Sequence, residues 1–548
     1  MTLFSRTGRG LRSADQISTR TDNTKRSSFA RRAAALALAA VFALSVTACA
    51  QSGGQTAQSG TADASKPAAV ATAATGETEA QEGGEFVFGI ASEVYNFDPF
   101  ESTTADSRAI CFNIYDGLMK ITPEGGFEPG LAQEYTMSDD ATVYTFTLRD
   151  GVKFHNGKTM EMADVLFSIQ KAIDAKINGY DKIASFEAVD DKTVQITLAA
   201  PDTGFLAYMT QAVVPDGSED LASNPVGAGP FKFEEFEEQD HVTLAKFEDY
   251  WGEKPHLDKV TVRFVANSSE MMIAFQAGTI NGFDASAGVS AQIDDTNARL
   301  YARNSNAVQL LALNNDTKYF QDEKVRQALS YAVDRDNIIE TVNFGYGVKI
   351  GTGMIPGLSK YYDNSLDDYY TTDVAKAKEL LKEAGYENGF EFTVTVPSNY
   401  QVHIDTAQVL VNQLAAAGVT MKIKEVDWPT WLESVYTNRN YEATIISLDG
   451  SFAYPTAFLA RYASDSSSNF VNFKSEAFDE AYSAATTSTD DEEQVKLFKE
   501  CQQVLTKEAA SVYLEDISSI YVYSMDFDGF VSYPLYAYDF SAVYKVAE

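Results

Sequence analysis

The chain has 548 residues, 45% of them hydrophobic and 12% aromatic, which excludes an intrinsically disordered protein and leaves room for two or three domains. Its formal net charge is −35, because 78 Asp and Glu outnumber 43 Lys and Arg. A surface this acidic repels phosphate backbones, so we expect no nucleic-acid partner and attribute the charge to solubility and mutual repulsion.

The first 48 residues are predicted to be a signal peptide. Most of its charged residues are basic, and an apolar stretch at 33–46 follows them. This stretch is too short to span a bilayer. The sequence Val-Thr-Ala-Cys at 46–49 resembles the bacterial lipobox, which implies cleavage before Cys49 and a lipid on its thiol. The alternative is ordinary secretory cleavage near Ala48 with an incidental cysteine.

Residues 49–84 are predicted to form a flexible, lipid-anchored tether. They consist largely of Ala, Thr, Gly, Ser and Gln, with almost no large apolar side chain. Such a segment cannot offset the conformational entropy that it would lose on ordering. We expect ordered structure to begin near Glu85.

The remaining cysteines, Cys111 and Cys501, are far apart in the chain and have helix-like apolar neighbours. This placement favours two buried free thiols over a disulfide. No CxxC or HExxH spacing occurs, so the sequence supports neither a dedicated metal site nor a cofactor.

Short strands and turns are predicted first. Apolar and polar residues alternate over 143–149, as in a half-buried strand, and turn signals follow at Gly151 and Gly157. A helix is predicted over 162–172.

Amphipathic helices dominate further along the chain. Apolar residues recur with helical spacing over 325–333, where Asp322 is a plausible N-cap. The same spacing returns over 374–384 and ends at Gly385.

Strands and helices alternate between 390 and 449. The predicted strands are 391–396, 420–426 and 442–448, and the helices between them are 405–417 and 429–436. This order indicates right-handed βαβ units and a largely parallel sheet.

Ligands of open α/β sheets bind outside the carboxyl ends of the strands. At those ends the sequence places polar and aromatic groups: Ser398, Asn399 and Tyr400, then Asp427 and Trp428, then Asp449, Gly450 and Ser451. This sheet edge is therefore a candidate binding site.

Three sequence blocks, 143–168, 224–262 and 320–339, resemble the extracellular solute-binding proteins of family 5. That family delivers peptides, nickel chelates and other solutes to ABC importers. The resemblance extends from about Glu85 to the C-terminus.

The resemblance implies an α/β, two-lobed periplasmic-binding-protein-like fold (type II, with an extra accessory domain) and a cleft between the lobes. The expected domains are a discontinuous lobe I (85–120, 224–314 and 520–548), an accessory domain (121–223) and lobe II (315–519). The alternating βαβ segment falls within lobe II.

The resemblance also implies a solute site at the predicted sheet edge. In peptide-binding members, an Asp that meets the peptide amine lies in a segment ending Pro-Thr-x-Phe-Leu, and 455–459 matches that ending. Counting back places Ser451 at the Asp position, with Asp449 as the nearest acid. Trp428 matches an aromatic that lines the pocket, and the loop 94–104 is expected to reach the cleft. The predicted ligand contacts are Tyr95, Asn96, Tyr400, Trp428, Asp449, Ser451 and Tyr454.

Other side chains keep two interpretations. Trp431 belongs either to the core or to the pocket, and Arg461 either meets a ligand carboxylate or forms a surface ion pair. His403 lies near the sheet edge and leaves open a metal chelate as solute. Trp251 is predicted to be structural.

The predicted function is that of a substrate-binding lipoprotein of an ABC importer. It would capture a peptide or similar small solute and deliver it to the permease subunits. The protein is expected to be a monomer without cofactors, lipid-anchored at the outer face of the bacterial cytoplasmic membrane. The alternatives are a binder of a non-peptide solute such as a metal chelate, and a lipid-anchored sensor. A hydrolase is disfavoured because the chain has no GxSxG elbow.

Overall fold

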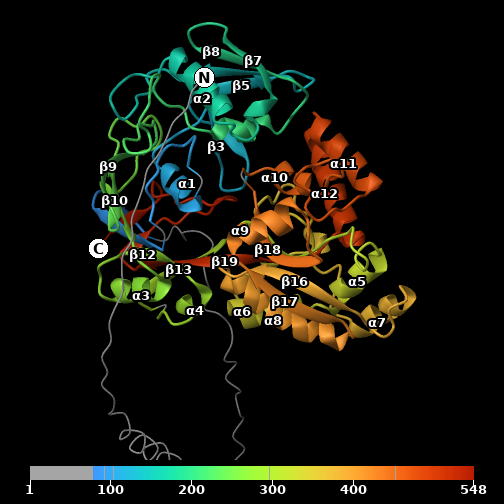
Figure 1. Ribbon diagram of the computed structural model, residues 1–548. Coiled ribbons are helices and arrows are strands. Elements are labelled where there is room, and N and C mark those ends of the chain that lie inside the picture. Colours follow the sequence, from blue (N-terminus) through green and yellow to red (C-terminus); the bar gives the residue numbers. More distant parts are fainter. Residues whose placement is uncertain (1–77, 92, 103, 295, 451, 548) are drawn as a thin grey trace, which may run out of the picture. The chain divides into compact units, whose positions relative to one another are not determined.

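The computed structural model describes residues 78–91, 93–102, 104–294, 296–450 and 452–547, all within the compact unit Ser65–Glu548 (Figure 1). The predicted signal peptide, Cys49 and most of the predicted tether lie outside these residues. Within them, no helix has the length and apolar character needed to cross a membrane.

One twelve-stranded sheet runs through the unit. Its main path, in order, is β17 (Thr420–Val426), β16 (Glu391–Pro397), β18 (Ala443–Asp449), β14 (Ala307–Leu313), β19 (Val512–Ser524), β12 (Gly282–Ala285), β2 (Glu85–Ile90), β11 (Lys259–Phe264), β10 (His241–Lys246) and β9 (Phe231–Glu237). Two further strands, β13 (Ala298–Asn304) and β15 (Gly347–Lys349), pair with β19.

The long strand β19 joins two halves of this sheet. Its first residues pair with β14 and β15, and its last residues pair with β12 and β13. We use lobe I for the half that contains β2 and β9–β13, and lobe II for the half that contains β14–β18. β19 is therefore the strand that the two halves share.

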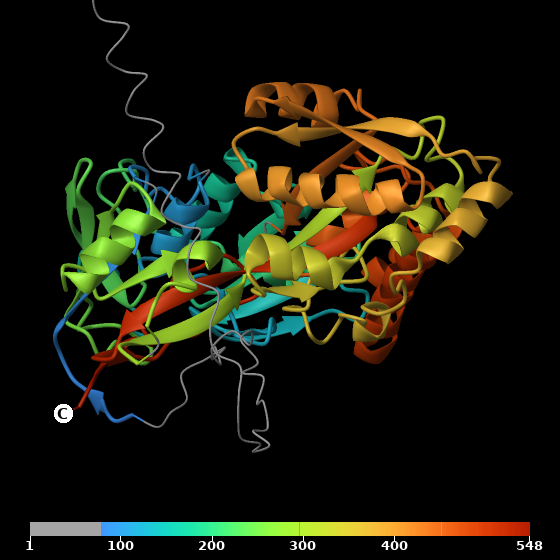
Figure 2. The same ribbon diagram turned by 90° about the horizontal axis from the view of Figure 1, so that it is seen from below.

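In lobe II the segment 390–449 forms the predicted alternation. β17, β16 and β18 are neighbours in parallel pairing, and the strands and helices of this segment, in orange, form one layered block in Figure 2. The first connecting helix, α8 (Gln401–Ala416), begins before the predicted position 405. Its N-cap is Tyr400, which makes no side-chain capping hydrogen bond, so the sequence contains no capping residue that would indicate the start. The second, α9 (Trp428–Trp431), continues as a π-helical turn, Leu432–Thr437.

The other helices of lobe II pack around these strands. The predicted helices are present as α5 (Glu323–Ala332) and α7 (Val374–Glu383). The Asp322 side chain accepts the Lys324 backbone N–H at 2.9 Å, which confirms the predicted cap. Lobe II also contains α6 (Arg335–Asn343), α10 (Thr456–Leu459), α11 (Glu476–Thr487) and α12 (Asp491–Lys507).

The core of lobe I is aromatic. Phe86 and Phe88 of β2 pack against β19, with ring centroids 5.0 Å apart for Phe86 and Tyr523 and 5.8 Å apart for Phe88 and Tyr521. Phe540 closes the same cluster from the C-terminal segment. The helices of this lobe are α1 (Ala105–Cys111), α3 (Ser268–Gln276) and α4 (Ala287–Ser290).

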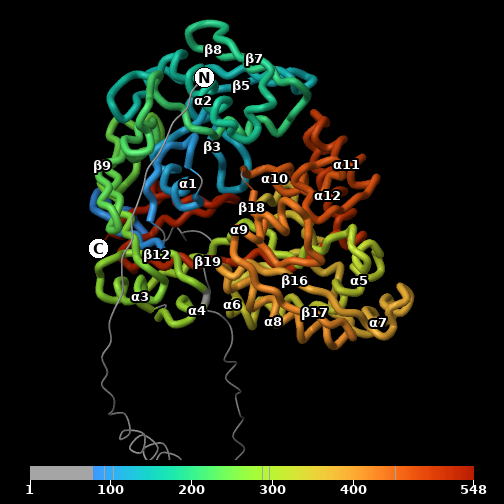
Figure 3. The backbone as a smooth tube through the Cα atoms, in the orientation of Figure 1, coloured from blue at the N-terminus to red at the C-terminus, as the bar shows by residue number. Residues whose placement is uncertain are grey.

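A separate antiparallel sheet lies inside the predicted accessory domain. Its strand order is β5 (Ala132–Met137), β6 (Val143–Leu148), β8 (Thr193–Leu198) and β7 (Ile183–Ala188). As predicted, β6 buries every second residue and is followed by a helix, α2 (Met162–Asp174), which lies beside this sheet in Figure 3. A short hairpin of β3 (Met119–Ile121) and β4 (Phe127–Pro129) precedes it.

Two predicted boundaries differ from the observed pairing. β1 (Ala80–Gln81) lies in the predicted tether but pairs with β21 (Tyr544–Val546), which in turn pairs with β20 (Phe527–Asp528). β14 was expected to end lobe I, yet its seven residues are buried and pair with β18 of lobe II. Both pairings are long-range, so local sequence patterns carry no sign of them. The other domain boundaries stay predictions.

The two cysteines of the described chain are buried free thiols, as predicted. Burial raises the pKa of the Cys501 thiol to about 12. Neither thiol is therefore a reactive group at neutral pH.

Candidate functional site

The carboxyl ends of three lobe II strands meet at one sheet edge. β16 pairs in parallel with both β17 and β18, with Pro397 opposite Val426. Beyond the strand ends, the Ser398 backbone N–H still donates to the Val426 carbonyl at 2.8 Å. The ends of β16 and β17 are therefore level, and β18, which pairs with β16 at Thr395 and Thr444, continues past them to Asp449.

A series of stacked rings leads away from the edge. Trp428 and Trp431 are parallel within 5°, with centroids 5.1 Å apart, and Tyr400 meets the Trp428 ring edge-on at 5.4 Å. Trp431 is 2% exposed and donates from Nε1 to Thr444 Oγ1 at 2.9 Å, so it belongs to the core. Trp428 is half-buried and Tyr400 is 40% exposed. The series continues inward to Tyr436, 6.2 Å from Trp431.

The two carboxylates of the edge differ in what they bind. Asp427 caps α9, and hydrogen bonds from the backbone and hydroxyl of Thr430 lower the pKa of its carboxyl. The Asp449 side chain is exposed and accepts no hydrogen bond from any described residue. Its main-chain oxygen accepts from Arg461 Nη2 at 2.8 Å. Asp449 therefore keeps a carboxylate available for a solute, whereas Asp427 is committed to the helix.

The structure does not bring every predicted contact to this edge. Tyr454 is 5% exposed, and its hydroxyl donates to Gln494 Oε1 at 2.8 Å inside the core of lobe II. Tyr95 is 70% exposed, and Asn96 accepts the Asp98 backbone N–H within its own loop. Among the described residues, no hydrogen bond or ring contact joins Tyr95 or Asn96 to the edge. Ser451 lies outside the described residues.

His403 sits behind the edge rather than on it. It is 3% exposed, with its Nδ1 3.1 Å from Gln309 Nε2. Burial lowers its pKa to about 4, so the imidazole is neutral at physiological pH. Among the residues that the structure describes, no group of three His, Cys, Asp or Glu side chains is placed to hold a metal ion.

A hollow of about 610 Å³ adjoins the edge, and we call it the Arg461 hollow. Lobe II contributes Tyr436, Phe452 and Arg461 to its wall, and the opposite wall includes Lys182 and Tyr208 from the predicted accessory domain. Sequence reasoning singled out only Arg461 among these. The others have no local motif, since they meet across more than 200 residues of sequence.

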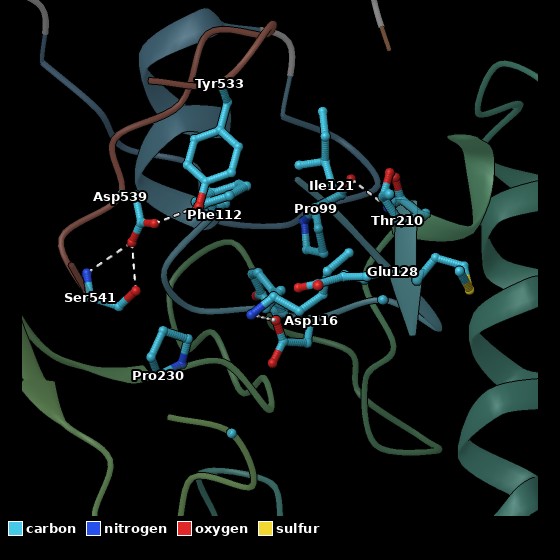
Figure 4. Close-up of a pocket in the computed structure, with 18 of the residues that line it drawn as sticks. Pro99, Phe112, Asp116, Ile121, Glu128, Thr210, Pro230, Tyr533, Asp539 and Ser541 are labelled. Carbon is cyan, nitrogen blue, oxygen red and sulfur yellow. Dashed lines mark hydrogen bonds and ion pairs between the residues drawn. The ribbon is translucent and has the colours of Figure 1, made fainter. Parts of the chain in front are cut away.

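A second hollow of about 610 Å³ is lined by residues of lobe I and of the predicted accessory domain, and we call it the Phe112 hollow. In Figure 4, Tyr533 and Asp539 stand beside Phe112, and Asp539 accepts hydrogen bonds from the Tyr533 hydroxyl and from Ser541. Asp116, at the base of the same figure, accepts from the Nε1 of a tryptophan at 2.8 Å.

That tryptophan is Trp251, which the sequence analysis expected to be structural. Its ring lies under the guanidinium of Arg149, with Cζ 4.7 Å from the centroid. Because Trp251 both binds Asp116 and stacks on Arg149, it ties three segments of the chain together. This geometry supports the structural interpretation.

Comparison with known proteins identifies the family of the chain. The family model for bacterial extracellular solute-binding proteins, family 5, matches residues 126–470. The chain belongs to this family. Its members are solute-binding proteins. The sheet edge and the hollow beside it are therefore candidate surfaces for a solute.

Relatives within the family share most of the chain. The glutathione-binding protein GsiB of Salmonella paratyphi A is 28% identical over 478 residues, covering 81% of this chain and 91% of its own. The solved structure of DppA from Helicobacter pylori in complex with the peptide STSA is 29% identical, covers 85% of this chain and 99% of its own, and superposes with a TM-score of 0.69. HbpA2 from Haemophilus parasuis, 24% identical, covers 85% of this chain and 100% of its own with a TM-score of 0.77. The fold is therefore the two-lobed periplasmic-binding-protein fold.

Proposed function

We propose that this protein captures a short peptide or peptide-like solute and delivers it to the permease of an ABC importer. The observations that carry the proposal are the Tyr400 and Trp428 rings, which pack edge-on at the ends of β16 and β17, and the unpaired Asp449 carboxylate at the end of β18. A carboxylate and aromatic faces suit a solute that has an amine and a compact body.

Two relatives support a peptide-like solute. GsiB is a glutathione-binding protein, and DppA was solved with the peptide STSA. Each of these ligands carries an amine and at least one carboxylate. A third relative, AgaA from A. tumefaciens, is 28% identical and was solved with agropinic acid, which keeps a non-peptide solute as the second candidate.

The proposed contacts are divided between the lobes. Trp428 and Tyr400 would pack on the solute, and Asp449 would pair with its amine, with Ser451 beside it. Tyr95 and Asn96 would close over the solute from lobe I by motion about β19. A solute that contacts both lobes stabilises the closed state by its difference in affinity for the two states. We leave out Tyr454 because its side chain is committed to the core of lobe II.

We further propose that the protein works as a monomer anchored through Cys49, on the outer face of the cytoplasmic membrane. Two acyl chains hold a protein stably to a bilayer, whereas one chain gives marginal binding. Labelling with a radioactive fatty acid tests this point. A Cys49→Ala variant that still incorporates label would contradict the anchor.

The proposed function is tested by thermal unfolding of the soluble mature chain, 50–548, with glutathione, a set of di- to tetrapeptides, nickel–histidine and agropinic acid. We expect a peptide-like member to raise the Tm, by an amount that grows with the logarithm of its concentration once this exceeds Kd. A shift with agropinic acid alone would favour the second candidate. A folded protein that responds to none of these solutes would contradict solute capture of this kind.

A further inference from the structure

The Arg461 hollow contains a cation that the protein does not neutralise. Arg461 belongs to the short 3₁₀ turn Ala460–Tyr462 that follows α10. Its Nη2 is held by the Asp449 carbonyl at 2.8 Å, but its Nη1 is buried without an acceptor among the described residues. None of the ion pairs among the described residues involves Arg461, whose side chain is partly buried. A buried guanidinium nitrogen without an acceptor is costly, and a planar carboxylate is the partner that the guanidinium fits best.

The rest of the hollow also favours an anion. Its charged lining residues are Arg461, Lys182 and Asp202, so the formal charge is +2 − 1 = +1 in a chain whose total is −35. Lys182 pairs with Asp202 and lies over the Tyr208 ring, 5.1 Å from its centroid. A local excess of positive charge in an acidic protein concentrates a solute anion at this place.

The walls can hold the body of a solute. Tyr208 and Phe452 pack against each other in its wall, with centroids 4.6 Å apart, and Tyr436 also lines the hollow. Tyr436 is also the inner end of the ring series that starts at Trp428. The buried Trp431 separates Trp428 from Tyr436, so the link between the hollow and the sheet edge is the hydrogen bond from Arg461 to the Asp449 carbonyl. A volume of about 610 Å³ is enough for a few residues of a peptide.

We propose that the Arg461 hollow is the subsite for a carboxylate of the solute, with Arg461 as the principal contact and Lys182 as a second cation. This inference rests on the proposed function and deepens it, because it states where the amine and the carboxylate of the bound solute lie. Asp449 organises both ends: its carboxylate faces the solute amine, and its main-chain oxygen holds the guanidinium that meets the carboxylate.

The test uses the mature chain 50–548 and pooled tetrapeptides, each made with a free and with an amidated C-terminus. Peptides retained by the protein are identified by mass spectrometry, and dissociation constants are measured for the best pairs. We expect the free acids to bind at least about tenfold more tightly than the amides, the effect of one charge-assisted hydrogen bond. In Arg461→Gln the two forms should bind within about threefold of each other.

Matched variants separate the charge from the fold. Arg263→Gln makes the same change on β11 of lobe I, where Arg263 pairs with Asp240, and should keep the preference. Arg461→Lys keeps the charge without the planar fork and should give an intermediate preference. Lys182→Gln should reduce the preference less than Arg461→Gln.

Each outcome decides something. Retention of amides only when they carry Asp or Glu would support the carboxylate subsite and assign its source to a side chain. Equal binding of acids and amides by the wild-type protein would overturn this inference while leaving peptide capture intact. Retention of no peptide by folded protein would overturn the proposed function, and the inference with it.

Discussion

The two hollows of this protein have the same volume, about 610 Å³, but treat their charges differently. In the Phe112 hollow, Asp116 and Asp539 accept hydrogen bonds from neighbouring side chains, and Arg149 stacks on Trp251. In the Arg461 hollow, a guanidinium nitrogen is buried without an acceptor, and the adjoining Asp449 carboxylate is unpaired. Volume therefore does not distinguish the two hollows, whereas the buried guanidinium nitrogen without an acceptor does, and the proposed site depends on that difference.

The largest effect is expected on stability, at the Phe112 hollow. Trp251→Ala removes a stacked ring and leaves Asp116 without its 2.8 Å donor. The free energy of unfolding should fall by about 3–5 kcal/mol in denaturant titrations. Solute affinity of the remaining folded protein should not change. A large loss of affinity without loss of stability would move the binding site to lobe I.

Two buried acids of β19 provide a second case of unsatisfied polar atoms. A buried carboxylate oxygen without a hydrogen-bond partner can be accommodated by protonation instead of by a bound solute. Asp516 and Glu515 of β19 are fully buried, and each has one oxygen without a hydrogen-bond partner. Burial raises the pKa of both carboxyls to about 7, from ordinary values of 3.8 and 4.5. Arg303 and the Asn343 amide, which face them, only partly oppose this rise.

The sign of the pH dependence follows from these pKa values. Between about pH 4 and pH 7 the folded chain binds more protons than the unfolded chain, so the free energy of unfolding falls as the pH rises through this window. The fall should be on the order of 3–4 kcal/mol for each of the two carboxyls, at about 1.4 kcal/mol per pKa unit. Denaturant titrations at several pH values give the free energy of unfolding as a function of pH. Over this range it should fall more steeply for the wild type than for the double variant Asp516→Asn/Glu515→Gln. Parallel curves would show that these acids are ionised in the folded state.

On the unsatisfied side, Trp428→Ala should weaken solute binding by about 2–3 kcal/mol, because it removes the half-buried ring that the solute would contact. The fold should persist, since Trp431 rather than Trp428 forms the core of the ring series. Calorimetric titration measures the affinity, and far-UV circular dichroism checks the fold. Unchanged affinity would exclude Trp428 from the site.

The two edge carboxylates form a matched pair. Asp449→Asn should weaken binding of solutes with a free amine about tenfold, the cost of losing one ionic hydrogen-bond partner. N-acetylated solutes should not respond to this change. If both kinds of solute lose affinity equally, Asp449 does not bind the amine.

The smallest effect is expected from Asp427→Ala. This change removes the N-cap of α9, so the Tm should fall slightly while solute affinity stays within experimental error. Thermal unfolding and calorimetry on the same preparation test both statements. A clear loss of affinity with an unchanged Tm would show that Asp427, rather than Asp449, faces the solute.

Much of the lobe II fold could be predicted from the sequence. The alternation over 390–449 combines local periodicity with stop signals at Gly385 and Gly418, and parallel pairing follows from the order of the elements. The meeting of Tyr400 and Trp428 at the ends of β16 and β17 follows from the same alternation. These features depend on contacts between residues close in the chain.

The features that the sequence did not predict depend on long-range contacts. The burial of Tyr454 requires Gly204, whose Cα leaves no room for a side chain beside the Tyr454 ring. The pairing of β14 with β18 and of β1 with β21 joins distant segments. Lys182 reaches the Arg461 hollow across the boundary of the predicted accessory domain. Local periodicity carries no record of such contacts.

The central claim is that the lobe II edge holds a solute with an amine and a carboxylate. It is tested most directly by mass spectrometry of the small molecules released when the protein, purified from its native host, is denatured. We predict about one equivalent of such a solute from the wild type and little from Trp428→Ala purified in parallel. An equal load on both proteins, or a released solute without these groups, would contradict the account.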